Sequence, residues 1–158
     1  MSKNPEKYKP EVCECCGQST TYVLPVDRGS ADIVIGIARA IKAKGINEIH
    51  PRKEMEVTAR THPNLANGEM TSNQINNLSR PRSHGLIAKV RGRKGFYCLT
   101  HKGIAFLKGE PVHKYAIMSK AQKKQVGYWQ PFPEGDERNM VSIKQLGFQS
   151  EYWEGIPN

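Results

Sequence analysis

Long hydrophobic runs are missing from this 158-residue sequence. No stretch approaches the roughly 18 consecutive apolar residues of a membrane-spanning helix, and the first residues lack the apolar core of a secretory signal. We therefore expect no membrane partner and no export, and the sequence predicts a cytoplasmic protein, in the host cytoplasm if it is viral. At 158 residues the chain supports one compact domain with an appendage, and with 37% hydrophobic residues its core is modest.

Motifs of the commonest enzyme classes are also absent. The sequence contains no Gly-x-x-x-x-Gly-Lys-Ser/Thr, Gly-x-Gly-x-x-Gly, Gly-x-Ser-x-Gly or His-Glu-x-x-His. We therefore expect a protein without catalytic activity. One enzymatic alternative stays open, because His50, Asn77 and His84 follow one another in the order of an HNH-like metal-dependent nuclease. Ile49 stands where an acidic metal ligand normally precedes the histidine, which speaks against this alternative.

Acidic residues are missing from the centre of the chain. The sequence holds 24 Lys and Arg against 15 Asp and Glu, a net charge of +9, yet residues 70–109 contain no acid. Their basic residues are Arg80, Arg82, Lys89, Arg91, Arg93, Lys94, Lys102 and Lys108. Such segregation is typical of a surface that binds a polyanion. A solvated basic face without a ligand remains the alternative.

Apolar spacing predicts the first elements. Residues 20–26 resemble a strand, and Asp32 is predicted to open a helix whose apolar stripe ends at Gly45. Residues 46–60 are ambiguous, although Pro51 suits the first turn of a short helix.

The basic segment contains a helix followed by a hairpin. We expect a helix over residues 72–80 with an amide-rich and arginine-rich polar side, then strands over 86–90 and 96–99 joined by the glycine-bracketed tip 91–95. Thr100 is expected to cap a closing helix over 101–109.

The rest of the chain flanks this segment. Residues 112–117 and 125–129 predict a second small hairpin. We divide the chain into an N-terminal arm with a cysteine knuckle (1–30), a central domain (31–110) and a C-terminal hairpin with an acidic, aromatic tail (111–158).

The central order resembles the C-terminal half of a winged helix-turn-helix domain of the MarR-like kind. The resemblance is carried by His84-Gly85-Leu86-Ile87 and by Tyr97-Cys98-Leu99-Thr100-His101-Lys102-Gly103. It is closer to small phage and prokaryotic proteins with a Cys-x-x-Cys-Gly knuckle before such a domain and Phe-Leu-x-Gly-Glu after it. The resemblance covers about residues 13–117. It implies an α+β fold: a winged helix-turn-helix with a zinc-knuckle-like arm and a small C-terminal β-hairpin.

Pro81 departs from that pattern, which usually has an aliphatic residue there. Because proline removes a helical hydrogen bond, we expect the recognition helix to end near residue 80, with residues 81–84 as a turn.

The resemblance implies that the polar helix enters the major groove of double-stranded DNA, the expected partner of a transcriptional or phage regulatory factor. Asn and Gln can pair with adenine, and Arg with guanine. The residues expected to read bases are Asn73, Gln74, Asn77 and Arg80. Those expected to hold phosphates are Arg82, Arg91, Arg93 and Lys94.

Three of the four cysteines lie close together, and the absence of a secretory signal favours metal ligation or reduced thiols over disulfides. Zinc takes four ligands, and the spacing of Cys13 and Cys16 recurs in Cys98 and His101. We expect these four residues to hold zinc. Substitution of one ligand by Cys15 or His113, and a metal-free thiol cluster, remain alternatives.

A protein-interaction module is the other function class that stays open. Aromatic residues of the C-terminal segment would form an interface with a host protein, mediate a homodimer or pack on the domain. They are Tyr128, Trp129, Phe132, Phe148, Tyr152 and Trp153.

Overall fold

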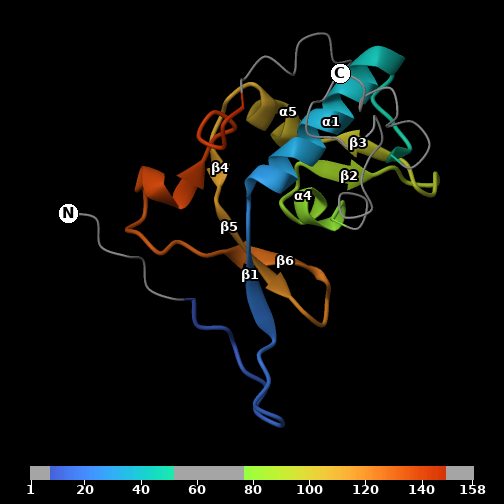
Figure 1. Ribbon diagram of the computed structural model, residues 1–158. Coiled ribbons are helices and arrows are strands. Elements are labelled where there is room, and N and C mark those ends of the chain that lie inside the picture. The colour runs from blue at the N-terminus through green and yellow to red at the C-terminus, as the bar shows by residue number, and fades with distance from the viewer. Residues whose placement is uncertain (1–7, 52–76, 149–158) are drawn as a thin grey trace.

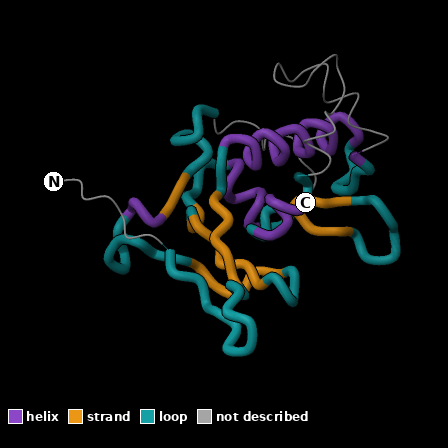
Figure 2. The backbone as a smooth tube through the Cα atoms, turned by 60° about the horizontal axis from the view of Figure 1, so that its bottom comes forward, coloured by secondary structure: helices purple, strands orange, loops and turns teal. Residues whose placement is uncertain are grey.

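A computed structural model of the chain describes residues 8–51 and 77–148. Within them the protein is α+β, as predicted, with helices and small antiparallel sheets. Figures 1 and 2 show the helices and the β2–β3 hairpin at one end and a three-stranded sheet at the other. That sheet has the order β1-β5-β6, with bounds Thr21–Pro25, Tyr115–Ser119 and Lys124–Tyr128.

The central helix α1 (Arg28–Lys44) contributes more residues to the large core cluster than any other described element. Its N-cap is Asp27, whose side chain accepts a hydrogen bond from the Ser30 amide, so the prediction that Asp32 opens the helix was wrong. Asp32 is 9% exposed and lies inside the helix. Gly45 ends α1 in the left-handed conformation, with φ 79°, which confirms the predicted C-cap.

The second described helix, α4 (Ser79–Ser83), contains Pro81. The expected stop before Pro81 was therefore wrong. Pro81 falls in the first turn, where the missing N–H would have no intrahelical partner, so the proline is tolerated. Residues 72–76, the rest of the predicted recognition helix, lie outside the described residues.

The elements after α4 confirm the predicted hairpin and closing helix. Strand β2 (Ile87–Lys89) pairs antiparallel with β3 (Tyr97–Leu99), and α5 (His101–Leu107) follows. Thr100 caps α5 by accepting a hydrogen bond from the Gly103 amide at 2.9 Å, and its hydroxyl donates to the Gly85 carbonyl. Phe106, which the sequence analysis did not assign to the core, is completely buried.

Gly103 brings α5 into direct contact with the start of β2. A Cβ atom at this position would lie 2.0 Å from the Leu86 carbonyl oxygen and 2.9 Å from its carbonyl carbon. The same carbonyl accepts a hydrogen bond from the Thr100 amide at 3.2 Å. Glycine is thus required at position 103 because the Leu86 carbonyl lies too close to leave room for a side chain.

The C-terminal segment and the N-terminal segment share one sheet. Strand β5 pairs with β1 from Thr21↔Ser119 to Pro25↔Tyr115, as well as with β6. The hairpin predicted over 112–117 and 125–129 is therefore present in part. Its first residues form a separate strand, β4 (Val112–His113), which pairs with β7 (Met140–Val141) after the 3-10 helix η2 (Glu137–Asn139).

Candidate nucleic-acid interface

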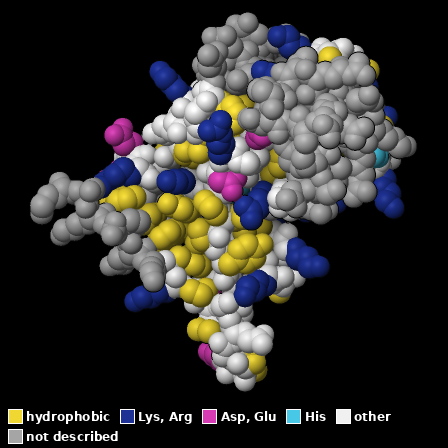
Figure 3. Space-filling view, in the orientation of Figure 1, with side chains coloured by type: hydrophobic (Ala, Val, Ile, Leu, Met, Phe, Trp, Pro, Cys, Tyr) yellow, Lys and Arg dark blue, Asp and Glu magenta, His cyan; other side chains and the backbone are white. Residues whose placement is uncertain are grey.

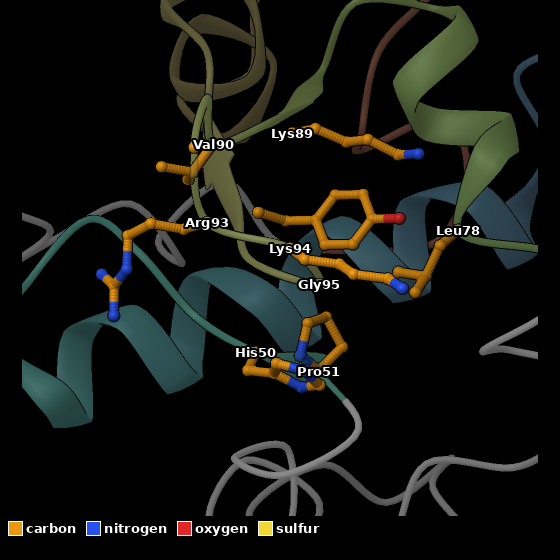
Figure 4. A pocket seen from close by; sticks show the side chains of 10 residues that line it. His50, Pro51, Leu78, Lys89, Val90, Arg93, Lys94 and Gly95 are labelled. Atoms are coloured by element: carbon orange, nitrogen blue, oxygen red, sulfur yellow. The ribbon is translucent and has the colours of Figure 1, made fainter.

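The tip of the β2–β3 hairpin and the start of α4 line one open hollow of about 840 Å³. Figure 4 shows the side chains of Lys89 and Lys94 extending across this hollow toward α4. Leu78, the N-cap residue of α4, lines the hollow on that side. Lys89, Arg91 and Lys94 are exposed. The hairpin lysines therefore present positive charge to a space that the start of α4 borders with the apolar Leu78.

Arg93 points the other way in Figure 4. Its guanidinium forms an ion pair with Glu48 and lies 3.8 Å from the centre of the Phe96 ring. The sequence analysis placed Arg93 among the phosphate-binding residues. In this structure the protein itself engages its charge, so Arg93 is the least available cation of the tip.

A second hollow, of about 490 Å³, lies on the other side of α4 and faces the β1–β5–β6 sheet. Asn77 and Arg82 line it from the α4 side, and Lys120 and Lys123 line it from the β5–β6 turn. Tyr22, 42% exposed, contributes an aromatic ring from β1. Over this sheet Figure 3 shows hydrophobic side chains gathered among Lys and Arg atoms.

Arg80, predicted to read bases, lines the second hollow and forms an intramolecular ion pair. Its Nη1 donates to Oδ2 of Asp27 at 3.0 Å, and the side chains of both residues are 42% exposed. Asp27 thus caps α1 with one oxygen and fixes α4 against α1 with the other. The ion pair assigns Arg80 a positioning role in this structure.

Removal of the Asp27 side chain tests this double role. We expect Asp27→Ala to lower the free energy of unfolding by about 1–2 kcal/mol, because it loses a helix cap and a partly exposed ion pair. Asp27→Asn keeps an oxygen that caps α1 and loses the charge, so it should cost less than half as much. Urea denaturation of both variants measures the difference, and equal losses would contradict the separation of roles.

The remaining predicted residues are distributed as follows. Asn73 and Gln74 lie outside the described residues. Asn77 is exposed before α4, and Arg82 is half-buried on it. Lys120 and Lys123 were not predicted as site residues, although residues 111–130 carry a net charge of +4 that could have indicated a second basic region. Nothing in the sequence indicated that the pairing of β5 with β1 places the β5–β6 turn beside α4.

The Cys13–Cys16 segment forms a tight turn, the knuckle turn. Gly17, with φ 70°, follows it, and its amide donates to the Cys13 carbonyl at 2.8 Å. Backbone N–H groups of Cys16 and Cys15 donate toward the Cys13 sulfur and lower the pKa of that thiol from its usual value.

The second half of the predicted zinc set lies elsewhere. Cys98 is on β3 and His101 opens α5, whereas the knuckle lies at the far end of the arm in both Figure 1 and Figure 2. Across residues 8–51 and 77–148, no three His, Cys, Asp or Glu side chains are grouped to hold a metal. The four predicted ligands are therefore not brought together.

The histidines of the nuclease alternative are separated from each other. His84 is 1% exposed, and burial lowers its pKa to about 4. His50 instead packs edge-on against Phe96, with ring centres 5.3 Å apart, next to the hairpin tip. The His84 side chain is thus in the core, whereas His50 lines the hollow at the hairpin tip.

Of the aromatic residues in the C-terminal segment, Tyr128 and Trp129 pack on the sheet, Phe132 lies beneath the Arg138 guanidinium, and Phe148 joins the large core cluster. Trp129 is half-buried and meets Tyr115 and Tyr8 edge-on, with ring centres 5.0 and 5.8 Å apart. The Tyr128 ring stacks on His113, and its hydroxyl accepts a hydrogen bond from Lys102 at 2.8 Å. Tyr152 and Trp153 lie outside the described residues.

Comparison with known proteins gives no assignment: no family model, curated protein or solved structure matches the chain. In the described part of the chain, every helix is too short or too polar to cross a membrane.

Proposed function

We propose that the protein binds nucleic acid, with double-stranded DNA as its partner, and that it acts as a non-catalytic transcriptional or phage regulatory factor of the winged helix-turn-helix kind. One observation carries the proposal: the acid-free segment folds so that Lys89 and Lys94 extend into a hollow shared with α4. Positive charge gathered beside a helix is the electrostatic requirement for holding phosphates while side chains reach the bases.

The proposed DNA contacts are assigned from the exposure and the ion pairs of each side chain. Lys89, Arg91 and Lys94 are exposed and hold phosphates on the hairpin side of α4. Asn77 is the described residue available to a base edge. Lys120 and Lys123 line the hollow on the opposite side of α4 and hold a more distant phosphate. Arg80 and Arg93 contribute through their ion pairs with Asp27 and Glu48.

The test is a titration of duplex DNA at several salt concentrations with the Lys89→Ala/Lys94→Ala variant. Loss of two phosphate contacts should weaken binding by roughly ten- to hundredfold at low salt and flatten the slope of log K against log[salt] by about 2. The matched control is Lys9→Ala/Lys144→Ala, which removes the same charge from exposed positions elsewhere. Arg93→Ala should have a smaller effect than either Lys89→Ala or Lys94→Ala.

Three results would contradict the proposal. The first is binding by the hairpin variant with unchanged affinity and slope. The second is an equal loss in the control pair, which would show that net charge alone matters. The third is nicking of the DNA when divalent metal ions are added, which would support the nuclease alternative.

A further inference from the structure

The hollow of about 490 Å³ between α4 and the β1–β5–β6 sheet, called the sheet hollow below, has an apolar floor. Leu24 and Met118 form this floor and are 9% and 2% exposed, whereas Tyr22 beside them is 42% exposed. Tyr22 pairs with Met118 across β1 and β5, and Leu24 lies two residues further along β1, so the three side chains share one face of the sheet. The sheet hollow therefore offers an accessible aromatic ring on an apolar base.

The rim of the sheet hollow is basic. Arg82 lines it from α4, and Lys120 and Lys123 line it from the β5–β6 turn. Arg80 also lines it, although its charge is paired with Asp27. Of the described residues that line this hollow, none is Asp or Glu. The rim therefore attracts an anion.

Lys123 adopts a backbone conformation that is unfavourable for lysine. Its φ is 53°, in the left-handed region, and among the described residues it is the only non-glycine residue with a positive φ. Its amide donates to the Ser119 carbonyl at 2.9 Å, which fixes the turn. A cation at a position that favours glycine indicates a contribution to function rather than to stability.

The sheet hollow lies next to the hollow at the hairpin tip that Lys89 and Lys94 border. Leu78 lines the hollow at the hairpin tip, and its chain neighbours Asn77 and Ser79 line the sheet hollow. Figure 1 shows α4 between the β2–β3 hairpin and the sheet. A nucleic acid held at the hairpin tip can therefore extend one strand past the start of α4 into the sheet hollow.

The chemistry of the sheet hollow suits an unpaired nucleotide better than a duplex. Within a duplex both faces of a base are stacked on its neighbours, so a tyrosine ring can stack only on a base that has left the duplex. Cations along the rim suit the phosphates of such a strand. The volume of about 490 Å³ also falls within the roughly 300–1,000 Å³ of small-ligand sites.

We propose that the sheet hollow binds an unpaired nucleotide of a single-stranded extension, with the base stacked on Tyr22 and the phosphates held by Arg82 and Lys123. This proposal rests on the proposed DNA binding and specifies the form of DNA that is bound. That form is a duplex that continues into a single strand.

The experiment measures the binding of fluorescent DNA by anisotropy, with a blunt duplex and the same duplex carrying a short thymidine extension at either end of one strand. We expect the extended duplex to bind more tightly. Tyr22→Ala should weaken the extended duplex by roughly 5- to 150-fold, the effect of losing one base–aromatic stack, and leave the blunt duplex unchanged. Tyr22→Phe keeps the ring and should keep the gain. The matched control is Val126→Ala, which shortens another exposed apolar side chain of this sheet outside the hollow.

Lys123 provides a second, independent variant. Lys123→Asn removes the charge and retains a residue type that accepts the left-handed conformation. It should weaken the extended duplex and lower the slope of log K against log[salt] by about 0.7, the value for one phosphate of a single strand. Lys123→Arg keeps the charge and should keep the affinity. Far-UV circular dichroism should give the spectrum of the unaltered protein for every variant.

Several outcomes would overturn the proposal. They are equal affinity for the extended and the blunt duplex, an equal loss on both in Tyr22→Ala, and an equal loss in Val126→Ala. Saturable binding of free thymidine monophosphate that depends on Tyr22, without any gain from the extension, would instead indicate a site for free nucleotides. A protein that binds the extended duplex through Tyr22 but not the blunt duplex would contradict only the proposed function, and no binding of any probe would overturn both.

Discussion

Replacing Gly103 by alanine is expected to lower the free energy of unfolding by about 3 kcal/mol or more. The added Cβ would lie 2.0 Å from the Leu86 carbonyl oxygen, and that oxygen belongs to backbone that cannot rotate away as a side chain can. To relieve the clash, α5 must move off β2. That motion breaks the hydrogen bonds that Thr100 makes to Gly85 and Leu86.

Gly29→Ala is the matched control, because Gly29 also lies in the first turn of a helix. There the nearest atom to an added Cβ is Oδ1 of Asp27 at 3.5 Å, an ordinary contact, and alanine favours the helical conformation. We expect Gly29→Ala to be neutral or stabilising by up to about 1 kcal/mol. Urea denaturation of both variants provides the measurement. Equal stability of Gly103→Ala and the unaltered protein would contradict the close approach of α5 to β2.

Acidification is expected to destabilise the protein through His84. Burial is the largest cause that lowers the pKa of this histidine from 6.5 to about 4, and Lys102 and Arg80 act in the same direction. Asp27 and the Pro25 carbonyl near the ring oppose the shift. The folded protein therefore keeps His84 neutral at a pH where the unfolded chain has already bound the proton.

The sign follows from this difference in proton binding. Between pH 6.5 and pH 4 the unfolded state binds more protons, so the free energy of unfolding falls as the pH is lowered. The loss from His84 reaches about 3 kcal/mol across this window. The pKa of the His113 ring is also lowered, by burial and then by Lys102, and adds a loss of the same sign. The Asp136 carboxylate, whose pKa Arg138 lowers to about 2, responds below this range.

Urea denaturation at pH 7.5, 6.5, 5.5 and 4.5 measures the effect. The slope of stability against pH should flatten in His84→Gln and in His84→Leu, whatever the stability of either variant at pH 7.5. His101→Gln, at an exposed histidine, should keep the slope of the unaltered protein. Parallel slopes in all four proteins would contradict a neutral, buried His84.

The predictions made from neighbouring residues fared best. Short apolar runs and bracketing glycines indicated β2 and β3, and Thr100 indicated the start of α5, because hydrogen bonds and caps of these elements join residues close in the chain. Local reasoning failed where two signals competed. Asp27 and Asp32 are both acidic residues near the start of α1, and the apolar stripe favoured the second, whereas the Ser30 amide is capped by the first.

The sequence predicted the positive charge of the candidate site but not the ion pairs that its arginines form within the protein. The acid-free segment identified the basic surface, but two of the arginines predicted to contact DNA form ion pairs with acids far away in the sequence. Arg80 meets Asp27 from 53 residues away, and Arg93 meets Glu48 from 45 residues away. Lys120 and Lys123 face α4 because β5 pairs with β1.

The sequence by itself determined the segregation of charge, the order of helix, hairpin and helix, and the knuckle turn at Cys13 and Cys16. Each of these depends on residue types and on spacings of a few residues. Only the tertiary structure decided which cations face outward, that the Leu86 carbonyl just before β2 requires glycine at position 103, and that the two predicted halves of the zinc set lie apart. These outcomes depend on how segments that are distant in the chain pack together. Residue types and short spacings do not show which distant segments come into contact.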